Sequence, residues 1–189
     1  VVGVCTPIGD KHVGKMAYAH EIPIITAGSL NGDTIPKNVH IGITAHSFDY
    51  IGKATRYKPT IGWIGYHPSL LPRHRGRSSI EWAIKMRDFL TGGTTFWLNS
   101  GIDRGDIIEQ EIVWIDPKMY SMDIKKASRL LWEHELQDIG VRLINKTIND
   151  IVNGTVKRRP QDNRFSTFEP SLNVKDIFRP DALMLNEKN

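Results

Sequence analysis

The chain has 189 residues, of which 40% are hydrophobic and 24% are charged, with a formal net charge of +4 at pH 7. These values are typical of a globular domain and exclude a disordered or fibrous chain. The single cysteine, Cys5, excludes an internal disulfide framework and a zinc site built from several cysteines. No apolar run approaches the roughly 18–20 residues that span a bilayer. These features predict a cytoplasmic protein that does not insert into a membrane.

The first half of the chain alternates short apolar runs with short helical patterns. Runs typical of buried strands cover residues 1–6, 22–26, 39–45 and 61–67. One short helical pattern ends the polar segment 8–21, before the second run. Another lies within residues 46–57, after the third run. Strands that alternate with helices predict an α/β fold with a mostly parallel, twisted sheet flanked by helices.

The second half adds a helix, two strands and a long helical region. Ser78 and Glu81 have the spacing of a capping box, so a helix is predicted from Ser78 to about Leu90, with Gly92 and Gly93 as its stop. Two strands are predicted next, at residues 94–100 and 106–114. A helical region follows at residues 121–153, and Gly140 is expected to interrupt it. We predict one domain over residues 1–170, followed by a tail over 171–189.

His67 is the first candidate for catalysis. Side chains alternate along a strand, so Gly65 and His67 face one side of the predicted sheet and Tyr66 faces the other. Ligand sites in open α/β sheets lie at the carboxyl ends of strands, where His67 is expected. A general acid or base would sit there. A purely structural histidine before a proline is the alternative.

Asp103 is the expected partner of His67. It lies in a turn rich in glycine and aspartate between two predicted strands, from which a carboxylate can reach a neighbouring strand end. A carboxylate that is hydrogen-bonded to a histidine fixes its tautomer and raises its basicity. Asp106 competes for this role, and Asp103 could instead stabilise the turn.

Three segments together resemble the folate-dependent formyltransferase family. They are YHPSLLPRHRG (66–76), GIDRGDIIEQ (101–110) and RPQD…STFEP (159–170). The family includes methionyl-tRNA, glycinamide-ribonucleotide and sugar formyltransferases and the hydrolase domain of 10-formyltetrahydrofolate dehydrogenase. The resemblance implies a Rossmann-like catalytic domain that uses 10-formyltetrahydrofolate, with His67 and Asp103 as catalytic residues.

The resemblance also implies a pterin pocket. Its lining maps to the segment after the third predicted strand and to the segment before Asp103. These cofactor-binding candidates are Asp49, Tyr50, Ile51, Asn99, Ser100, Gly101 and Ile102. The resemblance implies no metal, and the seven histidines show no ligand spacing.

The chain departs from the family pattern at two places. Gly65 stands where the family has an asparagine that stabilises the oxyanion, and the loss of one such donor costs about 10²–10³ in rate. A water above Gly65, Asn99, Ser100 or protonated His67 is expected to replace it. Family members also begin with a further strand and helix, so a strand inside the sheet is expected to be missing.

Three functions stay open. The first is formyl transfer to an amine of a sugar, a nucleotide or an aminoacyl-tRNA. The second is hydrolysis of 10-formyltetrahydrofolate, because the hydrolase domain also lacks the asparagine and carries tyrosine before the histidine. The third is a non-catalytic folate- or RNA-binding module. An arginine cluster either binds an anionic part of the substrate or is a solvated loop: Arg73, Arg75 and Arg77.

Overall fold

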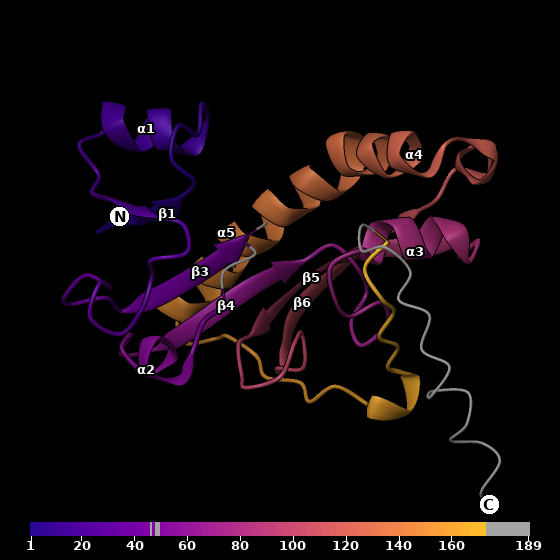
Figure 1. Ribbon diagram of the computed structural model, residues 1–189. Coiled ribbons are helices and arrows are strands. Elements are labelled where there is room, and N and C mark those ends of the chain that lie inside the picture. Colours follow the sequence, from indigo (N-terminus) through magenta and orange to yellow (C-terminus); the bar gives the residue numbers. More distant parts are fainter. Residues whose placement is uncertain (46, 48–49, 173–189) are drawn as a thin grey trace, which may run out of the picture.

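The computed structural model describes residues 1–45, 47 and 50–172, and it has an α/β fold (Figure 1). The predicted α/β class is therefore confirmed. Asp49, a predicted pocket residue, and residues 173–189 of the predicted tail lie outside the described residues. Within the described part of the chain, no helix has both the length and the apolar character needed to cross a membrane.

The strands form two sheets. A two-stranded parallel sheet pairs β1 (Val4–Thr6) with β2 (Ile24–Thr26). A four-stranded sheet has the order β3 (Ile41–Ala45), β4 (Gly62–His67), β5 (Leu90–Trp97) and β6 (Ile107–Trp114). The strands β3 and β4 are parallel, whereas β4–β5 and β5–β6 are antiparallel. The turn between β5 and β6 is too short for the crossover that parallel strands need.

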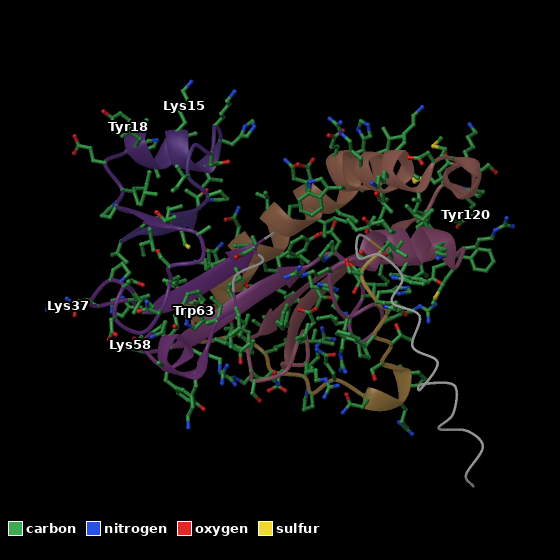
Figure 2. All side chains as sticks on the ribbon, in the orientation of Figure 1. Lys15, Tyr18, Lys37, Lys58, Trp63 and Tyr120 are labelled. Atoms are coloured by element: carbon green, nitrogen blue, oxygen red, sulfur yellow. The ribbon has the colours of Figure 1, made fainter. Side chains whose placement is uncertain are left out.

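The β1–β2 sheet stands apart from β3 (Figure 1). It carries α1 (Val13–Ala19), from which Lys15 and Tyr18 point away from the larger sheet (Figure 2). The sequence leads us to expect a gap beside these strands. In the structure β3 pairs with β4 on one side alone among the described strands, and its Ile43 is 40% exposed.

Helices cover one face of the four-stranded sheet. In Figure 1, α5 (Gln137–Val152) crosses behind the strands and continues from α4 (Ile124–Leu131), while α3 (Ser79–Lys85) lies near α4. Short elements complete the fold: α2 (Lys53–Arg56) and the 3-10 turns Pro117–Ser121 and Asn163–Phe165.

The largest core cluster lies between this helical layer and the sheet. Tyr66 belongs to it, as predicted from strand alternation, and its phenol donates a 2.5 Å hydrogen bond to the Leu136 carbonyl. Burial raises the pKa of this phenol. Residues Leu131, Ile139 and Leu143 pack in the same cluster. The opposite face of β4 is thereby left to Gly65 and His67.

The predicted end of α3 at Leu90 is wrong. The helix ends at Lys85, where Arg87 takes a left-handed φ of 57°. The Asp88 amide then donates to the Ala83 carbonyl at 2.9 Å, which is the bond pattern of a Schellman stop. The predicted capping box is also absent, because the Ser78 hydroxyl accepts from the Leu172 amide instead of capping the helix.

Gly92 and Gly93 belong to β5 rather than to a helix stop, so the strand begins at Leu90 and not at residue 94. A β-carbon at Gly92 would overlap the Glu111 carbonyl of β6. One at Gly93 would lie 2.6 Å from the ring of Tyr66. These glycines therefore allow close packing against β5. Glycine serves this purpose in strands, just as it ends helices elsewhere.

Gly140 does not interrupt the helical region. A β-carbon at Gly140 would lie 2.7 Å from the Tyr66 ring, so the glycine makes room for that ring. The irregular part is instead the π-helical turn Trp132–Leu136, between α4 and α5. The carbonyl of its last residue, Leu136, accepts the Tyr66 hydroxyl.

Candidate active site

His67 ends β4 with its ring buried, at 6% exposure. Its Nε2 lies 2.7 Å from the carbonyl oxygen of His74, seven residues along the chain. A carbonyl oxygen only accepts hydrogen bonds, so Nε2 carries the proton. In the neutral ring, Nδ1 is therefore the nitrogen that is free to accept a proton.

Asp103 lies close to His67, as predicted, and it faces Nδ1 of the ring. The distance from Nδ1 to Asp103 Oδ2 is 3.6 Å, which suits an ion pair and is too long for a hydrogen bond. The expectation that Asp103 fixes the tautomer by a hydrogen bond is therefore wrong, because the His74 carbonyl does so. Asp106 instead accepts the Trp97 amide through its backbone carbonyl at 2.9 Å, which continues the β5–β6 ladder.

The backbone around Asp103 is held by hydrogen bonds from outside the turn. Asp103 has a left-handed φ of 51°, a conformation that aspartate adopts more readily than most residues with a β-carbon. The Gln161 side-chain amide donates to the carbonyls of Asp103 and Gly105, at 2.9 and 2.7 Å. The Gly76 amide donates to Asp103 Oδ2 at 2.8 Å, and Gly76 itself has a φ of 101° that favours glycine. These bonds direct the carboxylate toward His67.

The arginine cluster divides into different roles. Arg75 is 4% exposed and donates to Gln161 Oε1 at 2.6 Å and to Asn163 at 3.0 Å. Burial lowers the pKa of its guanidinium, which nevertheless stays charged. Arg73 forms a two-bond ion pair with Asp88. For Arg75 the predicted solvated loop is wrong, because its side chain is buried and braces the residue that holds the Asp103 turn. Anion binding by the cluster stays a prediction.

Replacement of Gln161 by alanine is expected to affect stability and turnover together. The variant leaves the Asp103 and Gly105 carbonyls and one side of the Arg75 guanidinium without their partner, at about 1–3 kcal/mol of unfolding free energy. Chemical denaturation measures this loss, and the kcat of the reaction proposed below should fall as well. The control Asn163→Ala removes one bond to Arg75 and none to the turn, so a fall in kcat as large as that of Gln161→Ala would contradict this role.

Gly65 faces the same side of β4 as His67, but no space for water lies above it. A β-carbon at Gly65 would lie 2.8 Å from the Phe96 ring and 2.9 Å from Leu98. Phe96 is buried in a cluster with Leu71 and Ile107. The expectation that a water replaces the asparagine in that space is therefore wrong, since hydrocarbon fills it.

One of the predicted pocket residues, Ile51, packs on this face. Ile51 is buried in a cluster with Trp63, and Leu98 packs against both that cluster and the Gly65 position. Trp63 lies at the α2 end of β4 (Figure 2) and donates to the Thr55 carbonyl. The side chains of Tyr50 and Ile102 are 77% and 59% exposed. A line of apolar groups thus leads along the face toward His67.

The remaining pocket candidates lie in the turn after β5. The Asn99 side chain accepts the Gly101 amide at 2.8 Å, while Asn99 and Ser100 are exposed and Gly101 is half-buried. A folate-binding role for these residues stays a prediction.

Several residues of the site are not indicated by the sequence patterns described above. The ring of His74 meets Asp88 and Glu169, and Thr167 accepts the His74 amide at 2.8 Å. The signal was present in the late segment RPQD…STFEP, which supplies Gln161, Thr167 and Glu169. Among the described residues, no group of three or more His, Cys, Asp or Glu side chains is placed to hold a metal ion.

The family model described as formyl transferase matches residues 37–136, more than half of the chain. Methionyl-tRNA formyltransferase of Azobacteroides pseudotrichonymphae is 36% identical over 86% of this chain and 52% of that protein. That of Alkaliphilus oremlandii is 31% identical over 93% of this chain and 54% of that protein. The chain spans about half the length of these curated relatives.

Solved structures share the fold. A 4-N formyltransferase from Francisella tularensis superimposes with a TM-score of 0.67 at 22% identity, over 95% of this chain and 73% of that one. HypX from Aquifex aeolicus, in complex with tetrahydrofolic acid, gives a TM-score of 0.66 at 14% identity, over 90% of this chain and 30% of that one. At these identities the structures show the fold alone. The family match covers His67 and Asp103, and the chain belongs to the formyl transferase family.

Proposed function

We propose that residues 1–170 form the catalytic domain of an enzyme that transfers the formyl group of 10-formyltetrahydrofolate to an amine. The observation that carries the proposal is the pairing of His67 with Asp103. The Nε2 of His67 is committed to the His74 carbonyl, while Nδ1 faces a carboxylate that the Gly76 amide holds. A buried base with one fixed tautomer suits proton transfer during attack on a carbonyl carbon.

The face of β4 that carries His67 is the surface to which we assign the folate. Apolar groups at Ile51 and Leu98 lead toward the histidine, and the exposed side chains of Asn99 and Ser100 offer hydrogen-bonding groups beside them. Such a mixture of apolar wall and few polar groups is typical of sites for flat aromatic cofactors. HypX, which shares the fold, was solved in complex with tetrahydrofolic acid, and this supports a folate as the ligand class.

The bound folate supplies the formyl group, and the protein supplies the proton transfers. The His67 Nδ1 accepts the proton that the acceptor nitrogen loses when it attacks the formyl carbon. The same nitrogen returns the proton to the folate nitrogen when the carbon–nitrogen bond breaks. The carboxylate of Asp103, 3.6 Å away, stabilises the protonated ring between these two steps.

The acceptor that we favour is the amino group of an aminoacyl-tRNA. The two relatives described above are methionyl-tRNA formyltransferases that align with most of this chain. The formal net charge of +4 is compatible with an RNA substrate, whose phosphates attract basic proteins. A cytoplasmic location agrees with this acceptor and stays a prediction.

Hydrolysis of 10-formyltetrahydrofolate is the second candidate. The position of the family's asparagine is Gly65, and Phe96 and Leu98 fill the adjacent space with hydrocarbon. The side-chain amide that would stabilise the oxyanion is therefore absent from this position. Water as the acceptor gives formate and tetrahydrofolate, with His67 Nδ1 again taking the proton.

One experiment separates these functions. The full-length protein is incubated with 10-formyltetrahydrofolate, first alone and then with methionyl-tRNA, an amino-sugar nucleotide or glycinamide ribonucleotide, while tetrahydrofolate and formate are measured. Tetrahydrofolate that forms with an amine and without formate supports transfer, and formate without any amine supports hydrolysis. Folate binding without turnover under every condition would contradict both and would support the non-catalytic module.

A further inference from the structure

We propose that His74 is a positioning residue for His67. Its buried ring is held between two carboxylates, and this contact fixes the backbone carbonyl that receives the Nε2 proton of His67. The inference concerns the reaction proposed above and rests on that function. The tautomer of His67, however, can be measured without any turnover, so the two proposals can fail separately.

The ring of His74 is held from two sides. It is 2% exposed, and its Nε2 lies 2.7 Å from Asp88 Oδ2 in a hydrogen bond. Its Nδ1 lies 3.2 Å from Glu169 Oε1, in contact but not aligned as a hydrogen bond. Three elements therefore meet at this ring: the loop after β4, the turn before β5 and the late segment of the chain.

The Asp88 carboxylate is itself fixed in its charged form. Burial alone would raise its pKa, but hydrogen bonds from Arg73 and His74 outweigh burial and lower the pKa. Arg73 donates to both oxygens of Asp88, at 2.8 and 2.7 Å. The carboxylate is thus a charged, oriented acceptor for the His74 ring.

The backbone of His74 is held as firmly as its ring. His74 has a left-handed φ of 56°, which a residue with a β-carbon adopts at a cost and keeps only where its surroundings require it. Its amide donates to Thr167 Oγ1 at 2.8 Å, and the preceding carbonyl, of Arg73, accepts the Ser69 hydroxyl at 2.6 Å. Both of these groups belong to the peptide unit before His74. The peptide unit after His74 is held by the Arg75 amide, which donates to the Thr167 carbonyl at 3.1 Å, and the His74 carbonyl of that unit points toward His67 Nε2.

The direction of this carbonyl decides which nitrogen of His67 can act as the base. While the carbonyl accepts from Nε2, the neutral ring leaves Nδ1 unprotonated on the side of Asp103. If the carbonyl turns away, the ring can carry its proton on Nδ1, where the Asp103 carboxylate would attract it. Such a ring cannot accept a proton at Nδ1, so turnover falls while the folate-binding face is unchanged.

The test reads the ring of His67 directly. Protein labelled with 15N-histidine is examined by NMR, and the His67 signals are assigned from their loss in His67→Gln. In the wild type we expect a protonated Nε2 and an unprotonated Nδ1 in the neutral ring. In His74→Phe we expect the Nε2 proton signature to be lost, kcat to fall up to about 100-fold and KM to stay within about twofold.

Two variants serve as comparisons. His74→Gln keeps an N–H that can reach Asp88 and should recover part of the signal and of kcat. Thr91→Val is the matched control, because Thr91 is 2% exposed, lines the same cavity as His74 and Asp88, and its hydroxyl has no partner among the described residues. The His67 signals should not change in Thr91→Val.

A His67 spectrum that is unchanged in His74→Phe would overturn the proposal, whether or not the wild type turns over a folate. If His74→Phe does not fold, Asp88→Asn carries the same test, because it leaves the histidine in place and removes the charge that holds it. Loss of the Nε2 proton signature in Asp88→Asn would support the proposal, and an unchanged signature would overturn it.

Discussion

Replacement of His67 by glutamine should lower the turnover of 10-formyltetrahydrofolate by about 10²–10⁴, the range expected for removal of a general base. Glutamine is the informative replacement, because its side-chain N–H can still donate to the His74 carbonyl, which accepts the hydrogen bond from His67 Nε2 in the wild type. The loop after β4 therefore keeps its bond, and only the proton acceptor at the position of Nδ1 is lost.

The measurement is kcat for tetrahydrofolate release with the acceptor that supports turnover, together with the melting temperature. A melting temperature close to that of the wild type shows that the loss of rate is chemical. His134→Gln is the control, because His134 is an exposed histidine on the π-helical turn. Full activity in His67→Gln would sink the catalytic role of this histidine.

Replacement of Gly65 by asparagine, which restores the family's residue, should destabilise the protein rather than restore a function. The first atom of the new side chain would lie 2.8 Å from the buried Phe96 ring and 2.9 Å from Leu98. Overpacking of a filled core typically costs about 1–3 kcal/mol of unfolding free energy. Because the amide has no space beside His67, the ratio of hydrolysis to amine transfer should not change.

A double-mutant cycle with Phe96→Leu tests the physical reason. Leucine removes part of the ring next to Gly65, so Gly65→Asn should cost less in that background, and the acceptor ratio should change only there. Denaturant unfolding of the four proteins gives the coupling free energy. An equal cost in both backgrounds would show that Phe96 is not what excludes a side chain from this position.

The parts of the site that follow from local chemistry were predictable from sequence. Alternation along β4 placed His67 and Gly65 on one face, and turn chemistry placed Asp103 where it can reach the histidine. In the structure, Asp103 Oδ2 lies 3.6 Å from His67 Nδ1. The α/β class followed in the same way from the spacing of apolar runs.

The bonds that orient these two residues were not predictable, because they depend on the path of the chain between distant segments. Gln161 bonds to Arg75, 86 residues away, and to the Asp103 turn. The carbonyl of His74 is a backbone group, and its direction follows from a left-handed residue that no periodicity indicates. The prediction that Gly92 and Gly93 stop a helix is wrong for another reason. A pair of glycines is equally typical of a helix stop and of a closely packed strand.

A bound folate is expected to place its formyl group at Nδ1 of His67. The direct measurement is the 15N chemical shift of both ring nitrogens of His67 as 5-formyltetrahydrofolate, whose formyl group is on N5 rather than N10, is added to saturation. The same titration with 10-formylfolate, whose formyl group is on N10, should give a large change at Nδ1 and a small one at Nε2, which stays bonded to the His74 carbonyl. The N5 isomer should change Nδ1 less, because its formyl group is at another position. Saturable binding of 10-formylfolate that leaves Nδ1 unchanged would contradict the account.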